Sequence, residues 1–227
     1  MTQAPLHLRG LERSGLSADG LVVRPASDFD RIASNIAIWH DYDPTVKADL
    51  YSTCLVASGG AYLIDPSPLQ GDMVGWLVGS SPVAGIIVTS SNHDRASARF
   101  AEQFSAPIFA RGEAFPDKTP SRFRKVDDDD EICDGLRVIR IEGAAAGEIV
   151  LHYAPDGGTL IVGDALINFE PYGFTFLPAK YCSKEKEMRR SLQKLLDYKA
   201  ERMLFAHGTP ILSGASDRLQ SLLDSDF

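Results

Sequence analysis

The sequence predicts an α/β protein in which two mixed β-sheets pack face to face with helices on the outside, an αββα sandwich. Two observations predict it. Short apolar runs rich in β-branched residues alternate with turn residues, which is typical of strands. The predicted strands also come in two batches, each followed by an amphipathic helix. No internal repeat or low-complexity linker interrupts this pattern, so we expect a single domain over residues 1–227. About 20 residues at its start form a loosely ordered lead-in.

The first batch begins with a hairpin, because Gly59 and Gly60 separate two apolar runs. Residues 85–89 are nearly all β-branched, which indicates a strand buried on both faces. After this strand, apolar residues recur at helical spacing from Ala96 to Phe104. We therefore expect strands at 51–57, 61–65, 85–89 and 107–111, and helices at 69–78 and 95–105.

The second batch follows an acidic run from Asp127 to Glu131. That run lacks the interspersed spacing and central glycine of a calcium-binding loop, so we interpret it as a solvated turn. The clearest helix of the chain comes later, with Glu185 and Glu187 in its first turn and an apolar stripe that includes Leu192. We expect strands at 136–141, 148–153, 159–162 and 202–206, and helices at 183–198 and 216–223.

Composition limits the classes of function. The chain has 31 acidic and 23 basic side chains and a net charge of −8, which argues against binding nucleic acid or an anionic membrane surface. The three cysteines include no Cys-x-x-Cys pair, so neither a disulfide framework nor a thiolate zinc site is expected. Because no signal peptide is visible and no apolar run is long enough to cross a membrane, we expect a cytoplasmic protein.

A polar loop after the buried strand carries the most informative residues. It reads Thr-Ser-Ser-Asn-His-Asp-Arg from Thr89 to Arg95, and such loops are where α/β proteins build active sites. The loop resembles the Thr-His-x-His-x-Asp-His motif of the metallo-β-lactamase superfamily. Four further segments are similar to family motifs and lie in the family's order around it. They are residues 63–65 (Leu-Ile-Asp), 142–149 (Glu-Gly-Ala-Ala-Ala-Gly-Glu-Ile), 162–166 (Val-Gly-Asp-Ala-Leu) and 205–208 (Phe-Ala-His-Gly).

The resemblance covers residues 51–212 and implies the family's fold, but with an altered metal site. In the family, three histidines hold the first metal ion, and the matching positions here are Ser90, Asn92 and Ala144. Hydroxyl, amide and methyl groups cannot replace three imidazoles around zinc. The four positions of the second metal site hold Asp94, Arg95, Asp164 and His207. The resemblance therefore implies that the dinuclear zinc site is lost.

Arg95 stands where the family has a histidine of the second metal site. With no metal ion between them, the carboxylates of Asp94 and Asp164 would repel each other. A guanidinium keeps its charge, and its planar fork matches carboxylates. We therefore expect Arg95 to hydrogen-bond Asp94 or Asp164 and to supply the missing positive charge; the alternative is that Arg95 points to solvent.

Two further histidines are candidate binding residues. His93 occupies a spacer position when the motif is aligned without a gap. A shift of one position would place His93 on the family's second histidine but would lose Asp94, so we keep the gapless alignment. His93 then lies at the edge of the pocket or in an exposed part of the loop. His40 lies in a segment that often borders the pocket in this family, or in an exposed loop.

The resemblance leaves two functions open. The favoured one is a pseudo-enzyme or small-ligand binding module of this fold, without the usual metal-dependent activity and without a resident metal. The alternative is a hydrolase of an ester, thioester or lactone, in which Asp94, Asp164 and His207 hold one zinc or iron ion or act as acid–base groups without metal. Ligand binding is assigned to Ser90, Asn92, His93, Arg95 and His40. The expected partner is a small molecule, and a homo-oligomer is compatible with either function.

Overall fold

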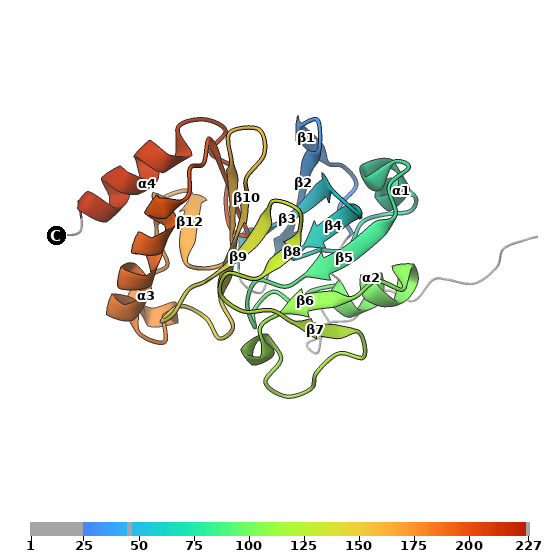
Figure 1. Ribbon diagram of the computed structural model, residues 1–227, viewed down its shortest axis with the longest axis horizontal. Helices are drawn as coiled ribbons and strands as arrows, with labels where there is room; N and C mark the ends of the chain where they lie inside the picture. Colours follow the sequence, from blue (N-terminus) through green and yellow to red (C-terminus); the bar gives the residue numbers. More distant parts are fainter. Residues whose placement is uncertain (1–24, 45–46, 226–227) are drawn as a thin grey trace, which may run out of the picture.

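The computed structural model describes residues 25–44 and 47–225, so the predicted N-terminal lead-in lies outside the described residues. Two large β-sheets pack face to face, and helices cover their outer faces (Figure 1). This is the predicted αββα sandwich. The helices are α1 (Met73–Val78), α2 (Ser97–Phe104), α3 (Glu185–Leu192) and α4 (Ala215–Asp224), with short 3₁₀ turns at Gly112–Ala114, Ala179–Tyr181 and Gln193–Asp197.

The first sheet has seven strands that follow one another in chain order across the sheet. They are β1 (Asp30–Ala33), β2 (Ile36–Asp43), β3 (Ala48–Ala57), β4 (Gly60–Ile64), β5 (Val83–Ile87), β6 (Ile108–Ala110) and β7 (Phe123–Lys125). The strands from β1 to β4 pair antiparallel, whereas those from β4 to β7 pair parallel. The carboxyl ends of β4 and β5 therefore meet at one edge of the sheet.

The second sheet has five strands in the order β14, β11, β10, β9, β8. Their bounds are β8 (Glu131–Cys133), β9 (Leu136–Arg140), β10 (Ile149–Tyr153), β11 (Thr159–Val162) and β14 (Arg202–Phe205). Only β11 and β14 pair parallel, so their carboxyl ends also lie together. A separate hairpin is formed by β12 (Leu166–Phe169) and β13 (Gly173–Phe176).

The central strands of the two sheets, such as β4 and β11, bury both of their faces, which is why they read as nearly continuous apolar runs. In β10, Leu151 packs in the layer between the two sheets, whereas its neighbour Val150 packs under α3 and α4. On the other side, α1 and α2 cover the first sheet through Leu77 and Phe100. Each such aliphatic or aromatic side chain contributes about 1.5–3 kcal/mol when fully buried. The core thus has three layers, and the sheet–sheet layer lies beside the strand ends that form the site.

Three local expectations change. The segment around Trp39, expected in part as an exposed loop, is strand β2; Trp39 is 1 % exposed and its Nε1 donates to the carbonyl of Ser67 (3.1 Å). Strand β7, which pairs with β6, lies in a segment for which no strand was predicted. The predicted helix 183–198 is α3 followed by a 3₁₀ turn. In each case pairing or packing with distant residues decides the structure.

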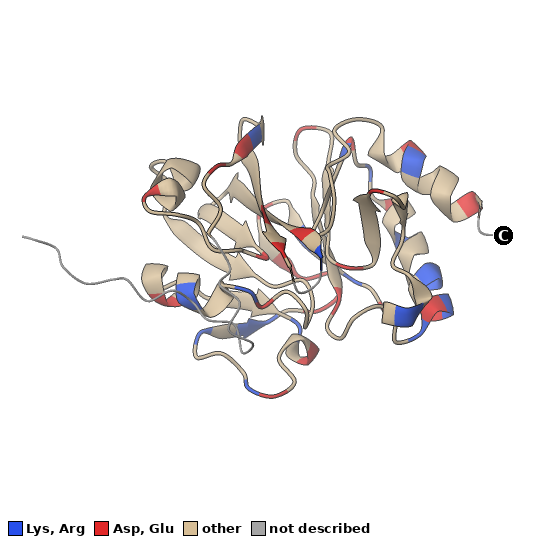
Figure 2. Cartoon of the chain, turned by 180° about the vertical axis from the view of Figure 1, so that it is seen from behind, with Lys and Arg blue, Asp and Glu red and all other residues tan. Residues whose placement is uncertain are grey.

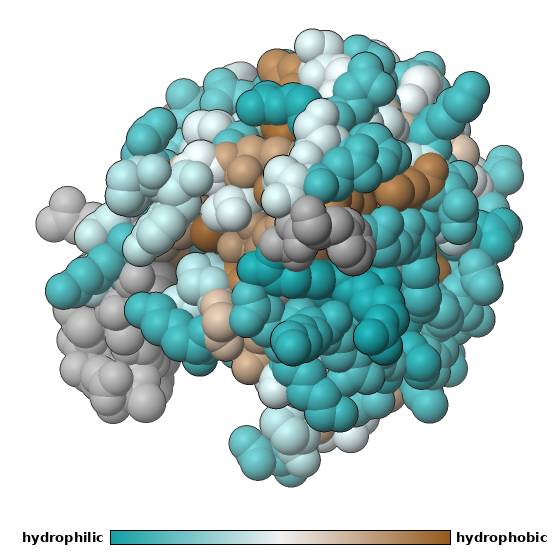
Figure 3. Space-filling view, turned by 90° about the vertical axis from the view of Figure 1, so that its left-hand side faces the viewer, coloured by the Kyte–Doolittle hydropathy of each residue, from teal (hydrophilic) through white to brown (hydrophobic). Residues whose placement is uncertain are grey.

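Helix α3 carries charged residues on its outer face. Figure 2 shows Lys, Arg and Glu side by side on α3, where Arg189 and Glu185 form an ion pair at 2.6 Å. From the side that bears α3 and α4, the surface is largely hydrophilic, with apolar atoms in small patches (Figure 3). Among the helices of the described residues, none is long and apolar enough to span a membrane.

Candidate functional site

The candidate site lies where strand ends from the two sheets meet. The main-chain N–H of Ile149 donates to the carbonyl of Thr89 (2.8 Å), which follows β5. The main-chain N–H of Tyr51 in β3 donates to the carbonyl of Ala206 (2.9 Å), which follows β14. These bonds join the two sheets, so residues directly after β4, β5, β11 and β14 are brought to one place.

Three side chains converge there. The Nε2 atom of His93 lies 3.2 Å from Oδ1 of Asp164, and Nε2 of His207 lies 3.3 Å from the same oxygen. The two Nε2 atoms are 3.3 Å apart. The potential ligand atoms of these three residues all lie within 4.8 Å of one another, and no other such group of His, Cys, Asp or Glu occurs in the described part of the chain. The arrangement could hold one metal ion.

His93 is held from behind by a buried hydrogen-bond network. Its Nδ1 lies 2.8 Å from Oγ1 of Thr89 and 3.1 Å from Oδ2 of Asp65. The Thr89 hydroxyl donates to Asp65 (2.5 Å) and therefore accepts from His93. Nδ1 is thus the protonated nitrogen, and Nε2 faces Asp164 and His207. A carboxylate behind a metal-ligating histidine fixes its tautomer and orientation in this way.

Asp164 is oriented by two residues of the polar loop. The hydroxyl of Ser90 donates to Oδ2 (3.0 Å), and the amide of Asn92 donates to the same oxygen (2.9 Å). Oδ1 is left facing the two histidines. Ser90 and Asn92 were predicted as binding residues, and the structure places both at the site, where they contact the Asp164 carboxylate.

A second buried carboxyl supports the main chain at Asp164. Oε1 of Glu148 accepts from the N–H groups of Asp164 (2.8 Å) and Ala165 (3.0 Å). This close approach depends on Gly163, because a Cβ there would lie 2.6 Å from Oγ1 of Thr89 and 2.8 Å from Oε1 of Glu148. Burial and the nearby Asp164 raise the pKa of Glu148 well above its usual range.

Charge is concentrated on the His93 side of the site. Burial alone would lower the pKa of His93, but the carboxylates of Asp164 and Asp65 outweigh burial and raise it to about 10. The pKa of Asp164 is held well below its usual range against burial, chiefly by the charge of His93 and by hydrogen bonds from His207 and His93. Burial lowers the pKa of His207. Without a metal ion, the two carboxylates thus favour the protonated form of His93.

These features fit a known family. A sequence model described as the metallo-β-lactamase superfamily matches residues 31–225. The chain belongs to the metallo-β-lactamase superfamily.

Solved structures of metallo-β-lactamases share its fold. DIM-1 metallo-β-lactamase is 16 % identical with a TM-score of 0.70, and the match covers 90 % of this chain and 100 % of that chain. A metallo-β-lactamase from Erythrobacter litoralis is 15 % identical (TM-score 0.69, 87 % and 96 % covered). A family protein from Thermus thermophilus is 20 % identical (TM-score 0.64, 86 % and 80 % covered). No curated protein matches the chain.

The side chains of the 89–95 loop face the site in a different pattern from the one that the gapless alignment with the superfamily motif predicts. His93, expected at the pocket edge or in an exposed part of the loop, joins Asp164 and His207 in the group of three. Asp94, expected in that group, is exposed, and its carboxylate accepts a hydrogen bond from the Ser97 hydroxyl. The physical reason is electrostatic: the buried carboxylates of Asp65 and Asp164 attract the His93 ring. An alignment of the motif does not show these two contacts. Ala144 is a buried core residue, as its methyl group suggests.

Arg95 also differs from the expectation for this superfamily position. Its guanidinium donates to the main-chain carbonyls of Tyr51, Asp65 and Ala206. The predicted hydrogen bond to the side chain of Asp94 or Asp164 is not found among the described residues. One carbonyl oxygen within β3 and two just after β4 and β14 lie within reach of the fork, whereas Oδ2 of Asp164 is already bound by Ser90 and Asn92.

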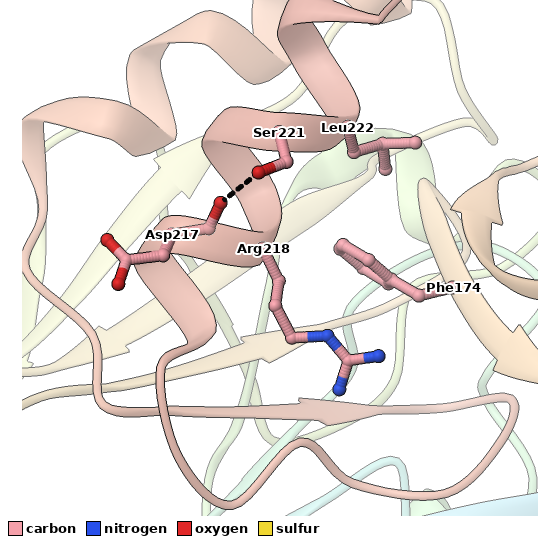
Figure 4. A pocket seen from close by; sticks show the side chains of 5 residues that line it. All are labelled: Phe174, Asp217, Arg218, Ser221 and Leu222. Atoms are coloured by element: carbon pink, nitrogen blue, oxygen red, sulfur yellow. Dashed lines mark hydrogen bonds between the residues drawn. The ribbon is translucent and has the colours of Figure 1, made fainter.

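His40 lies apart from the group of three. It sits on β2, its ring stacks on that of Tyr51 (centroids 4.8 Å apart), and its Nδ1 is 3.8 Å from Asp49. A separate surface pocket of about 420 Å³ lies between β13 and α4, and Figure 4 shows Phe174 and Arg218 on its wall. None of the three converging side chains lines that pocket.

Sequence reasoning missed three site residues: Asp65, Thr89 and Glu148. All three were noted as parts of motifs, and Glu148 also as the start of a strand. A signal was present for Asp65 and Glu148, because each is a carboxylate next to a largely apolar strand, and a carboxylate that is buried there needs a partner.

Proposed function

We propose that this chain is a hydrolase of the superfamily that works with one metal ion held by His93, Asp164 and His207. The observation that carries the proposal is the convergence of their three donor atoms, with His93 and Asp164 each oriented by buried partners. Three protein ligands with an open position are typical of catalytic zinc. Two histidines and one carboxylate also suit ferrous iron. His93 thereby takes the part that the gapless alignment assigned to Asp94.

The residues around this group have separate tasks. When bound, a metal ion of this kind activates water and polarises a carbonyl oxygen. Asp65 keeps the proton of His93 on Nδ1, so that Nε2 is free to bind metal. Ser90 and Asn92 hold one oxygen of Asp164 and leave the other for the ion. The side chain of His207 is 17 % exposed, against 6 % for Asp164 and 1 % for His93. Substrate therefore reaches the group from the His207 side.

The hydrogen bonds of the polar loop also support the proposal that the family's dinuclear site is lost. Ser90 and Asn92 stand at two positions of the first metal site, and both donate to Asp164 instead of offering an imidazole to an ion. Asp94 is bonded to Ser97, and Arg95 carries a positive charge. With one ion instead of two, we propose substrates whose carbonyl groups need little activation: esters, thioesters or lactones rather than β-lactams.

A second candidate function is a binding module that needs no metal. One observation favours it: His93 lies between the carboxylates of Asp65 and Asp164, and as an imidazolium it would contact both and offset one of their two negative charges. The site would then bind a small ligand without catalysis. Metal content separates the two candidates.

The test begins with zinc and iron content, measured by mass spectrometry on protein purified without added metal. Chelator-stripped protein is then titrated with each metal and assayed on a nitrophenyl ester, a thioester, a lactone and a β-lactam. We expect about one ion per chain and metal-dependent hydrolysis of an ester-type substrate, with a loss of at least about 100-fold in His207→Ala. His152→Ala, at a half-buried histidine of β10 whose Nε2 contacts the carbonyl of Lys199, is the matched control. Full activity in stripped protein, or no binding of either metal, would contradict the proposal.

A further inference from the structure

Arg95 is fixed in place by the main chain of both sheets. Its Nη1 donates to the carbonyls of Tyr51 (2.5 Å) and Asp65 (2.8 Å), and its Nη2 donates to that of Ala206 (3.4 Å). Tyr51 lies in β3, Asp65 follows β4, and Ala206 follows β14. These carbonyl oxygens belong to the main chain in or next to strands, so their positions are set by the sheets and they orient the guanidinium.

The main chain of Arg95 is itself constrained. Its φ is +42°, in the left-handed region that a side chain with a Cβ adopts only at a cost. Such a conformation persists when the surroundings determine it. The three carbonyl contacts are those surroundings, and they place a positive charge inside the site rather than in solvent.

This charge adjoins the metal-binding group on two sides. Asp65 accepts from Arg95 through its carbonyl and holds His93 through its carboxylate. Ala206 accepts from Arg95 and directly precedes His207. The guanidinium is therefore linked through one residue to each of the two histidines.

The buried charges around the metal-binding group limit how many metal ions it can hold. Asp65 and Asp164, the two carboxylates that contact His93, contribute two negative charges, and Arg95 contributes one positive charge. With both imidazoles neutral, as metal binding requires, one divalent ion changes this net charge from −1 to +1. A second ion would leave at least one uncompensated positive charge in the site, even with Glu148 ionised and with Asp43, whose charge also acts on Arg95, included, and such a buried charge is unfavourable.

We propose that Arg95 is a fixed internal cation in the place of a second metal ion, so that the group of His93, Asp164 and His207 holds one ion and holds it less tightly than its ligands alone would. This inference rests on the proposed function, since it concerns the same site. It makes Arg95 a residue that sets metal affinity by charge, without contact to the metal.

The test compares variants that differ in charge at this position. Arg95→Gln keeps N–H donors for the carbonyls but removes the charge, and Arg95→Met is a second neutral variant. Arg95→Lys keeps the charge. Arg99→Gln, on the exposed face of α2, is the control for a general change of net charge. Zinc affinity is measured by competition with a chromophoric chelator, and stoichiometry by mass spectrometry after equilibrium dialysis.

We expect one ion per chain in the parent and zinc binding tighter by about tenfold or more in the neutral variants, the size of a close unit charge in a partly desolvated site. Arg95→Lys and Arg99→Gln should bind like the parent. Neutral variants that bind no tighter, an equal gain in Arg99→Gln, or failure of both neutral variants to fold would overturn the inference. A parent without zinc affinity refutes the proposed function instead; the inference then stands if the neutral variants gain zinc binding and falls if they do not.

Discussion

Oδ2 of Asp65 lies 3.1 Å from Nδ1 of His93, in the interior and on the side of the ring away from Asp164 and His207. This pair determines which ring nitrogen carries the proton and which one faces the candidate metal position. Asp65 follows β4 and His93 follows β5, two neighbouring parallel strands, so the pairing is a direct product of the sheet. The metal-binding capacity of His93 thus depends on a residue that does not itself face the metal position.

Asp65→Asn should weaken zinc binding by about 10- to 100-fold, because the carboxylate that fixes and activates His93 is lost. The measurement is chelator competition on stripped and refilled protein. Asp49→Asn is the matched control, since Asp49 is exposed and lies beside His40 rather than His93. Equal zinc affinity in Asp65→Asn and the parent would show that His93 is not a ligand held by Asp65.

Ser90→Ala should lower the free energy of unfolding by about 1.5–3 kcal/mol, because a buried hydrogen bond to the Asp164 carboxylate is removed. Urea denaturation of the metal-free protein measures this change. Ser91→Ala is the control, because Ser91 is bonded through its main-chain N–H to Ala146, and it should change stability by less than about 0.5 kcal/mol. If the two variants unfold alike, the Ser90 hydroxyl does not hold Asp164.

Gly163→Ala should destabilise the protein by about 1–3 kcal/mol or more, because the new Cβ meets Thr89 and Glu148 within a close-packed region. Gly75→Ala in α1 is the opposite case: a Cβ there meets nothing, and helix propensity favours alanine by about 1 kcal/mol. Thermal unfolding of both variants checks the pair. A Gly163→Ala protein as stable as the parent would mean that the strand ends are less closely packed than described.

Glu148→Gln should change the pH dependence of stability in the metal-free protein. The folded-state pKa of Glu148 lies above the usual value of 4.5, so above that pH the unfolded chain releases a proton that the folded chain retains. The parent therefore loses stability as pH rises, at up to about 1.4 kcal/mol per pH unit for this group. Glutamine does not titrate.

The stability of Glu148→Gln relative to the parent should accordingly increase from about pH 4.5 upward, as measured by urea denaturation at a series of pH values. The constant part of the difference is not informative, because Oε2 of Glu148 already lacks a partner and the glutamine amide would too. A difference that is the same at every pH would show that Glu148 ionises normally in the folded protein.

The sequence predicted the fold well because the fold depends on features that are local. The β-branched run at 85–89 and the hairpin glycines at 59–60 match β5 and the turn between β3 and β4, with shifts of one to three residues. It predicted β2 poorly, because that strand mixes polar residues such as His40 with apolar ones and is fixed by pairing with β3.

Part of the site was likewise predictable from the sequence, and the rest depends on the tertiary structure. The motif frame by itself determined that Asp164 and His207 belong to the site, since each closely follows a buried strand whose end points there. The tertiary structure decided that His93, rather than Asp94, completes the group. His93 contacts the buried carboxylates of Asp65 and Asp164, which attract a cation, whereas Asp94 would add a further negative charge there and is instead exposed, with the Ser97 hydroxyl donating to it. The tertiary structure also decided where Arg95 points, because its three carbonyl partners come from strands that are distant in the chain and adjacent only when both sheets have packed.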